Sequence, residues 1–324
     1  MTTEQSIPVV NLQDFLSEDP AKRQAFVKVV GDALTDLGFF AVTHHGVDSD
    51  LIKQCYGLCE AFFTQSDEVK CKSERPELKG QRGFTSFGRE SAKDSQTADL
   101  KEYFHVGREL DEHHPELSKY GPNIWPETPD VPETFRPSFL DLYSQLEDCA
   151  RHLLKACALY LEQSETLFAD MARDGDTILR IIHYPPVPDD AEPSAMRAAA
   201  HEDINLITLL CEATDGGLEL LQRDGTWRAI HALDGQIIVD AGDMLQNLTN
   251  GILKSTTHRV VNPDNNRSRR FSMPFFVHPR GDVDLSPLST CVEREGEQKY
   301  PNISAGEYLL QRLHEMGLHK NKAS

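Results

Sequence analysis

The sequence has no long apolar run and no paired cysteine motif, and each absence excludes a class of protein. No apolar stretch approaches the roughly 18 residues that a membrane span requires. Residues 1–10 lack the basic and apolar regions of a secretory signal. The seven cysteines are scattered and form no CxxC pair, so neither a disulfide scaffold nor a zinc ribbon is indicated. We therefore expect a cytoplasmic protein that does not act in a membrane.

Positive charge is also scarce. Lys and Arg total 33 against 52 Asp and Glu, which gives a net charge of -19. A compact basic patch would be needed to bind a phosphate backbone against this charge, and the short RSRR cluster at 267–270 is the one basic cluster that stands out. Nucleic acid is therefore not expected as a partner.

The first half of the chain has the apolar periodicity of helices. Apolar residues repeat at helical spacing over 26–37 and over 51–63, with Asp48 or Ser49 as the cap of the second helix. Residues 72–130 have little such pattern, and a strand is expected only near 103–106. An irregular stretch of this length is typical of a functional loop or lid. Residues 133–172 predict a long helix or a broken pair of helices.

After Gly175 the pattern changes to short strands separated by turn residues. The segments TILRIIHY, NLITLLCEA, GLELLQ, TWRAIHA, QIIVDAG, STTHRVVN and RRFSMPFFV are all strand-like, which favours a β-sandwich, jelly roll or barrel. Ser304 and Glu307 form a capping box for a final helix that ends near Gly317. The expected fold is α+β with a mainly β core, divided into 1–130 (N-terminal region), 131–175 (helical segment), 176–282 (β core) and 283–324 (C-terminal helix), all in one integrated unit.

A candidate metal site begins at His201 and Asp203. If both lie in one strand, they project to the same face while Glu202 turns away. His258, from a different strand, would supply a third ligand. Two histidines and one carboxylate with open positions form the facial triad of non-haem Fe(II) oxygenases. Zinc hydrolases with the same donors usually carry an H-E-x-x-H helix, which is absent here. Taken alone, these residues are more simply explained as side chains that pair with neighbours and bind no metal.

Arg270 and Ser272 form a candidate anion site. They share a face of one strand, expected to adjoin the strand of His258, and a guanidinium and a hydroxyl together can bind a carboxylate. Arg269 would point away into solvent. Tyr184, at the end of TILRIIHY, could add a hydrogen bond from its phenol group.

The order H-x-D, H, R-x-S resembles that of the Fe(II)/2-oxoglutarate-dependent oxygenases, in particular the branch similar to isopenicillin N synthase. Beyond the site, the segments IPVVNL, LGFFAVTHHGV, DLKEYFHVG, GGLELL, DGTWRAI, IIVDAGDMLQNLTNG and THRVVNP resemble corresponding parts of the family from the N-terminus to the core. Two departures are visible. Glu202 stands where the family usually has Thr or Ser, and Ile182-His183 stands where it has Asn before the Tyr-Pro pair.

The resemblance implies a distorted double-stranded β-helix, or jelly roll, flanked by N-terminal helices and a C-terminal helix. It implies Fe(II) held by His201, Asp203 and His258, and a distal 2-oxoglutarate carboxylate held by Arg270, Ser272 and Tyr184. The implied reaction uses O2 to convert 2-oxoglutarate to succinate and CO2 while a small molecule is hydroxylated, desaturated or similarly oxidised. His183, His231 and His278 are expected to have no catalytic role.

The expected substrate pocket uses the loop region and the C-terminal helix. Its candidate residues are aromatic or basic and lie between 80 and 106, although the aromatic ones could simply pack a lid: Phe84, Phe87, Arg89, Tyr103 and Phe104. Three other functions stay open at this point. They are an oxidase of the same branch that does not consume 2-oxoglutarate, an enzyme that fragments 2-oxoglutarate to ethylene, and a protein that binds iron and 2-oxoglutarate without turnover.

Overall fold

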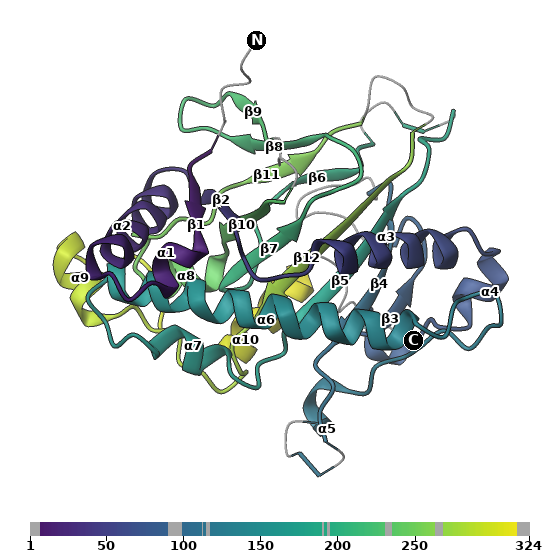
Figure 1. Ribbon diagram of the computed structural model, residues 1–324, viewed down its shortest axis with the longest axis horizontal. Helices are drawn as coiled ribbons and strands as arrows, with labels where there is room; N and C mark the ends of the chain where they lie inside the picture. The colour runs from purple at the N-terminus through teal and green to yellow at the C-terminus, as the bar shows by residue number, and fades with distance from the viewer. Residues whose placement is uncertain are drawn as a thin grey trace.

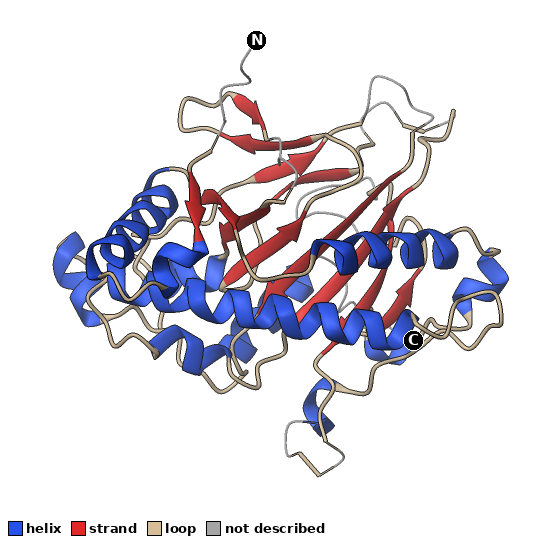
Figure 2. Ribbon diagram, in the orientation of Figure 1, coloured by secondary structure: helices blue, strands red, loops and turns tan. Residues whose placement is uncertain are grey.

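Two β-sheets face each other, and helices cover the outer side of the larger one (Figure 1). The computed structural model describes residues 7–89, 99–111, 113–114, 117–189, 191–192, 195–230, 235–262 and 268–315. Figure 2 shows strands running through the middle of the molecule with helices on the periphery. The prediction of an α+β protein with a jelly-roll-like β core is confirmed.

The larger sheet combines strands from both halves of the chain. Its eight strands have the order β1-β2-β10-β7-β12-β5-β4-β3. Their bounds are β1 Val9–Asn11, β2 Phe39–Thr43, β10 Ile237–Ala241, β7 Ile207–Cys211, β12 Arg270–Val277, β5 Ile178–Tyr184, β4 Glu102–Gly107 and β3 Gly83–Thr85. The smaller sheet has the order β6-β11-β8-β9, with bounds β6 Ala198–His201, β11 His258–Val260, β8 Leu218–Leu221 and β9 Trp227–Ala229.

The helices are distributed along the whole chain. The bounds are α1 Leu12–Leu16, α2 Pro20–Asp36, α3 Ser49–Phe63, α4 Asp67–Cys71, the 3₁₀ turn η1 Pro76–Leu78, α5 Leu117–Tyr120, α6 Phe135–Tyr160, α7 Leu167–Ala172, α8 Asp243–Leu248, α9 Ser289–Glu295 and α10 Ala305–Glu315. The 26-residue α6 and the shorter α3 lie along the outer face of the larger sheet (Figure 1). No helix in the described ranges is both long and apolar enough to cross a membrane.

The main core lies between this outer face and the helices. Phe62 of α3 packs edge-on against Phe104 of β4 at a centroid distance of 5.1 Å, and Phe135 and Phe139 of α6 stack at 4.6 Å in the same cluster. Helix α2 joins the core through Gly31, because a Cβ atom there would lie 2.0 Å from the ring of Tyr160. The close approach of α2 to α6 therefore requires glycine at this position.

The predicted helices are confirmed, and most of the predicted strands are too. The capping box is present, since Glu307 N donates to the Ser304 hydroxyl at 3.3 Å and Ser304 N donates to Glu307 Oε2 at 3.1 Å. The broken pair of helices is found as α6 and α7. Sequence patterns missed the short elements β3, β6 and α9, which are too brief for periodicity to distinguish from loop. The predicted end near Gly317 lies outside the described residues.

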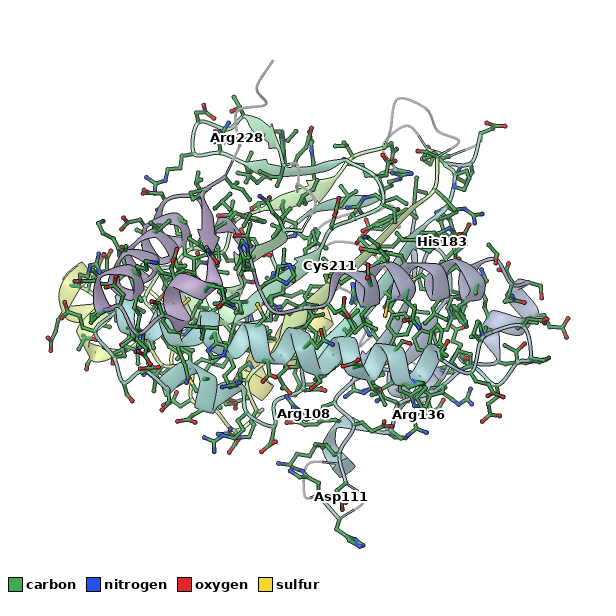
Figure 3. All side chains as sticks on the ribbon, viewed as in Figure 1. Arg108, Asp111, Arg136, His183, Cys211 and Arg228 are labelled. Atoms are coloured by element: carbon green, nitrogen blue, oxygen red, sulfur yellow. The ribbon has the colours of Figure 1, made fainter. Side chains whose placement is uncertain are left out.

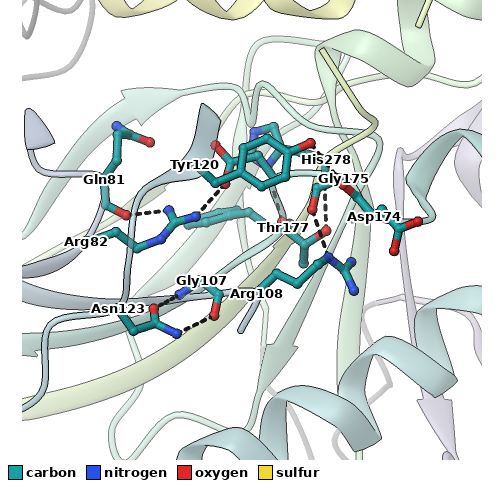
Figure 4. Close-up of polar contacts among 12 residues, drawn as sticks. Gln81, Arg82, Gly107, Arg108, Tyr120, Asn123, Asp174, Gly175, Thr177 and His278 are labelled. Carbon is teal, nitrogen blue, oxygen red and sulfur yellow. Dashed lines mark hydrogen bonds and ion pairs between the residues drawn. The ribbon is translucent and has the colours of Figure 1, made fainter. Parts of the chain in front are cut away.

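Polar contacts hold the segment between β3 and α6 against the start of β5 (Figure 4). Arg82 is fully buried and donates from Nη2 to Asp176 Oδ1 at 2.7 Å. Asn123 pairs with both backbone groups of Gly107, and Arg108 Nε donates to the carbonyl of Gly175 at 3.1 Å. These bonds give the irregular region a fixed position beside the sheet.

Candidate metal centre

His201, Asp203 and His258 converge in the cavity between the two sheets. The Nε2 atoms of both histidines lie 3.8 Å from Asp203 Oδ1. One donor atom from each residue lies within 4.8 Å of the others, which makes this the one group of three metal-binding side chains found in the described ranges. His201 and His258 are direct partners across β6 and β11, so the register of the small sheet places their rings 4.4 Å apart.

Neighbouring groups orient all three donors. Each histidine Nδ1 faces a backbone carbonyl, that of Ala199 at 2.8 Å and that of Thr256 at 3.1 Å. An Nδ1–H donated to a carbonyl leaves the Nε2 lone pair available to a metal. Asp203 Oδ2 accepts a hydrogen bond from the Thr208 hydroxyl, which leaves Oδ1 facing the histidines.

The pKa of His201 also suits a metal site. Burial and the adjacent His258 lower the pKa of His201 to about 4, although Asp203 opposes the shift. A neutral imidazole is the form that binds a cation. The donor set of two imidazoles and one carboxylate therefore fits Fe(II) in both its chemistry and its arrangement.

Two details of the predicted geometry are wrong. His201 is the last residue of β6, and Asp203 lies in the loop that follows, so strand alternation does not bring them together. Tertiary contacts hold Asp203 in this loop, since Asp243 N donates to its carbonyl at 2.7 Å and the Thr208 hydroxyl donates to its Oδ2. The strand of Arg270 also does not adjoin that of His258, since β12 belongs to the larger sheet and β11 to the smaller.

Arg270, Ser272 and Tyr184 lie together at one end of this cavity. It has a volume of about 70 Å³, and its lining includes these three residues and the three metal-site residues. Arg270 is 2% exposed, and its guanidinium lies 5.0 Å from the centre of the Tyr184 ring. Its Nε donates to the carbonyl of Asp215 at 3.0 Å, while its buried Nη1 has no hydrogen-bond partner among the described residues. A buried guanidinium nitrogen of this kind fits an incoming carboxylate.

Sequence reasoning missed two further cations at this end. Arg197 is 1% exposed and lies 5.9 Å from the centre of the Tyr184 ring, on which Arg270 also lies. Burial and the proximity of Arg270 lower the pKa of Arg197. Lys101 lines the cavity and bonds to Asp99 at 2.8 Å. Lys101 lies in the segment DLKEYFHVG, but nothing in the sequence marked the side chain of Lys101 or of Arg197 as buried beside this site.

A buried carboxyl group was also missed. Asp240 lines the same cavity from β10, where it is the register partner of Thr208. Burial and the nearby Asp203 raise the pKa of Asp240 well above its ordinary value. Alternation along QIIVDAG could have placed this side chain on the inner face of the sheet.

A second cavity of about 100 Å³ lies on the other side of the metal site. Arg180, His201, Asp203 and Phe276 line both cavities. The second is also lined by residues from a loop, from the ends of β4 and β12 and from α10: Gln81, His105, His278, Leu309 and Leu313. The expectation that the C-terminal helix contributes to a pocket is therefore met. His278, expected to have no role, lies in this cavity.

The five predicted substrate residues lie in three different environments: the inner face of the sheet, the main core and the exposed surface. Tyr103 lies on the inner face of β4, where its ring contacts Arg180 and His105. Phe84 and Phe104 belong to the main core on the outer face, as the packing alternative anticipated. Phe87 and Arg89 are exposed, and Arg89 Nε donates to Ser86 at 3.2 Å. A direct substrate role for these five residues stays a prediction, because none of them is among the residues found to line either cavity.

Glu202 and His183, which depart from the family pattern, each make specific contacts in the structure. Glu202 accepts a hydrogen bond from the Thr257 hydroxyl at 2.9 Å and does not join the metal group. His183 lies on the opposite face from Tyr184, as alternation predicts, where it bonds to Glu102 at 2.8 Å and stacks on Phe271 at 4.9 Å. Figure 3 shows His183 and Cys211 inside the molecule near α3. His231 lies outside the described residues.

Comparisons with known proteins agree with this geometry. Residues 7–128 match the family described as "non-haem dioxygenase in morphine synthesis N-terminal", and residues 175–279 match the 2OG-Fe(II) oxygenase superfamily. The proline hydroxylase buaE of Petromyces alliaceus is 33% identical over 93% of this chain and 96% of its own.

Solved structures agree as well. A 2OG-Fe(II) oxygenase family protein from Caulobacter crescentus is 36% identical, with a TM-score of 0.84, over 96% of this chain and 99% of that one. A full-length Neurospora crassa protein, solved in complex with alpha-KG, is 26% identical, with a TM-score of 0.84, over 97% of both chains.

The chain belongs to the 2-oxoglutarate–Fe(II) oxygenase superfamily. It is a non-haem dioxygenase that uses Fe(II), 2-oxoglutarate and O2 and couples the decarboxylation of 2-oxoglutarate to the oxidation of a second molecule.

Proposed function

We propose that His201, Asp203 and His258 hold the iron of this dioxygenase, and that Arg270, with Ser272 and Tyr184, binds the distal carboxylate of 2-oxoglutarate. The observation that carries the proposal is the arrangement of one cavity. Two Nε2 atoms and a carboxylate oxygen converge in this cavity, which is also lined by a buried arginine, one of whose nitrogens has no partner among the described residues.

Iron and 2-oxoglutarate, when bound, supply the oxygen activation and the oxidising power. The residues of this chain position these partners. Thr208 holds the Asp203 carboxylate, and the carbonyls of Ala199 and Thr256 hold the two imidazoles. Arg270 would hold the distal carboxylate of the keto acid. Leu309 and Leu313 of α10 line the second cavity with apolar side chains.

The second molecule in this proposal is a small molecule, and its oxidation is a hydroxylation or a related reaction such as desaturation. The small volume of the second cavity, about 100 Å³, supports this size class. The relatives include a proline hydroxylase, named for a small molecule, and the Neurospora crassa protein, which was also solved with thymine. The order of the H-x-D, H and R-x-S motifs supports a place in the branch similar to isopenicillin N synthase.

A cytoplasmic location belongs to the same proposal. All seven cysteines are free thiols, and six of them are buried, which suits a reducing compartment.

The test is release of CO2 from 2-oxoglutarate labelled at C1. Purified protein with Fe(II), O2 and ascorbate, which supplies the two electrons that the second substrate would otherwise provide, is expected to release CO2 and form an equal amount of succinate, and His258→Ala is expected to release none. Oxygen consumption that is independent of 2-oxoglutarate would favour an oxidase of the same branch and would contradict the proposed role of Arg270. Ethylene among the products would identify the fragmentation reaction.

A further inference from the structure

One histidine of the second cavity has a ring nitrogen that is available to a ligand. His278 follows the end of β12 and lines this cavity together with Phe276 and with His201 and Asp203 of the metal site. Its side chain is 9% exposed, and its Nδ1 faces the carbonyl of Phe276 at 3.2 Å. Its Nε2 has no hydrogen-bond partner among the described residues.

The contact with Phe276 decides which nitrogen of His278 carries the proton. A carbonyl oxygen can only accept a hydrogen bond, so Nδ1 is the nitrogen that donates. Burial lowers the pKa of His278, although Asp176 and the Phe276 carbonyl oppose the shift, and the ring is therefore neutral at neutral pH. In a neutral ring whose proton is on Nδ1, the Nε2 atom is a hydrogen-bond acceptor.

Contacts with the segment before β5 fix the backbone of His278 (Figure 4). His278 N donates to the Thr177 hydroxyl at 3.3 Å. Gly175 lies directly against the His278 carbonyl, since a Cβ atom on Gly175 would lie 2.1 Å from that oxygen. The bond to Phe276 holds the ring itself. An acceptor held in this way is preorganised, so little side-chain entropy is lost when a donor binds to it.

The rest of the lining combines an apolar wall with one further uncharged polar group. Leu309 and Leu313 of α10 contribute apolar side chains, as does Ile204. The side-chain amide of Gln81 can both donate and accept hydrogen bonds. Such a cavity suits a ligand that has one polar end and an apolar body.

The charged groups of the lining do not favour a negatively charged ligand. Glu202 and Asp203 are carboxylates, and Glu202 accepts a hydrogen bond from the Thr257 hydroxyl at 2.9 Å. Arg180, the arginine of this lining, already donates from its Nε to Nε2 of His105 at 2.6 Å. A ligand carboxylate would share the cavity with the Glu202 carboxylate and would present a second acceptor to His278. An uncharged hydroxyl or N–H group meets neither repulsion.

We propose that the oxidised substrate is a small molecule with an uncharged hydroxyl or N–H group that donates to Nε2 of His278, and with an apolar part that packs against Leu309 and Leu313. This inference rests on the proposed function, since it takes the adjoining metal group to be the iron site. His278 then determines specificity, because its hydrogen bond fixes the polar end of the substrate beside that site.

The test compares pairs of small molecules that differ in the donor group. A lactone has the shape of the lactam of equal ring size but carries an oxygen in place of the N–H group. Protein loaded with Fe(II) and saturating 2-oxoglutarate is kept anaerobic, so that no turnover occurs. The pairs are γ-butyrolactam with γ-butyrolactone, δ-valerolactam with δ-valerolactone, and phenol with fluorobenzene. The shift in Tm at increasing concentration gives each Kd. In at least one pair the donor is expected to bind about 3- to 10-fold more tightly, as one uncharged hydrogen bond would give.

Substitutions of His278 test whether this preference comes from its Nε2. His278→Leu removes the acceptor, so both members of a pair are expected to bind equally. His278→Gln is expected to keep the preference, because its amide oxygen can accept the same bond. A merely structural role for His278 would change the affinity for both members alike. If His278→Leu does not fold, His278→Met takes its place.

A matched control comes from a histidine elsewhere in the chain. His152 lies on α6 outside both cavities, so His152→Leu is expected to leave the preference unchanged. Equal Tm shifts within every pair in the wild type, including no shift at all, would overturn the inference. A preference that survives in folded His278→Leu or His278→Met would overturn it too.

Binding of 2-oxoglutarate, measured for every variant, distinguishes the two proposals. A wild-type protein that binds no 2-oxoglutarate would contradict the proposed function. A wild-type protein that binds 2-oxoglutarate but shows no preference for the donor would contradict only the assignment of His278.

Discussion

The two faces of the larger sheet are equally well buried, yet they bury opposite kinds of side chain. On β12 the outer face carries Phe271, Met273, Phe275 and Val277, which belong to the main core. The inner face of the same strand carries Arg270, Ser272, Pro274 and Phe276, which line the cavity of the metal group. Arg270 at 2% and Met273 at 0% exposure show that burial alone does not separate the two faces.

The difference teaches where stability and function come from. The outer face is sealed by α3 and α6 and gains free energy from apolar burial. The inner face buries the guanidinium of Arg270, and a buried charged group costs free energy unless it is paired. The outer face therefore stabilises an arrangement that the inner face alone would not favour. Substitutions on the outer face should therefore lower stability with little effect on ligand binding. Substitutions on the inner face should weaken ligand binding with little effect on stability.

The largest effect is expected for a metal ligand on the inner side. Asp203→Ala should weaken Fe(II) binding by more than the 10- to 100-fold that is typical for loss of a residue that only orients a ligand. It should not unfold the protein, because it removes a buried carboxylate rather than core packing. Iron content after gel filtration and Tm measure the two effects. Full iron occupancy and unchanged turnover would contradict the assignment, and Asp224→Ala in an exposed turn is the control.

A substitution on the outer face should lower stability but leave the affinity for 2-oxoglutarate nearly unchanged. Phe275 is fully buried and packs edge-on against Tyr143 at 4.9 Å. Phe275→Ala should lower the free energy of unfolding by about 3–5 kcal/mol through lost burial and a residual cavity. The affinity for 2-oxoglutarate should stay close to that of the wild type. Urea denaturation and a 2-oxoglutarate titration check the pair of outcomes. A large change in affinity with little loss of stability would break the distinction between the faces.

Arg270→Leu should raise the KM for 2-oxoglutarate about 10- to 150-fold, because it removes a charge-assisted bond worth about 1.5–3 kcal/mol. Stability should change little. Steady-state kinetics at several 2-oxoglutarate concentrations measure the effect. The adjacent Arg269 is exposed and provides a matched control, since Arg269→Leu should leave KM unchanged. An unchanged KM in Arg270→Leu would place the anion site elsewhere.

The smallest effect is expected for Thr208, whose hydroxyl donates to Asp203 and accepts a hydrogen bond from Asn205 Nδ2 at 2.9 Å. Thr208→Val keeps the shape of the side chain but removes the hydroxyl that donates to Asp203. Fe(II) affinity should fall about tenfold, at the lower end of effects seen for such supporting residues. Thr208→Ser should restore most of it, which a purely steric role for the threonine would not explain. Competition with a coloured iron chelator measures the affinity.

Much of this fold could be predicted, because the strands after Gly175 alternate clearly and the helices carry capping signals. Arg270 and Ser272 share a face as i and i+2 residues of β12, and that part of the prediction needed no tertiary information. The convergence of His201 and Asp203 was expected for the wrong reason. Asp203 lies in the loop after β6, where its carbonyl accepts a hydrogen bond from Asp243 N, and no local pattern predicts a contact between residues so far apart in the sequence.

The substrate side of the site was less predictable for a physical reason. Arg180, His105 and His278 come from different strands and meet only through the sheet register and the approach of α10. One signal was available, since alternation places Arg180 on the same face as Tyr184. The aromatic residues Phe84 and Phe104 stood out in the sequence, but they pack on the outer face, where their size stabilises the core.

The central claim is that the inner face holds iron and 2-oxoglutarate together, with Arg270 at the far end. An anaerobic titration of 2-oxoglutarate into Fe(II)-loaded protein tests it most directly, by the weak visible charge-transfer band of the chelate. We predict a saturable band in the wild type, a band that needs much more 2-oxoglutarate in Arg270→Leu, and no band in Asp203→Ala. Iron that stays bound without any band in the wild type would contradict the claim.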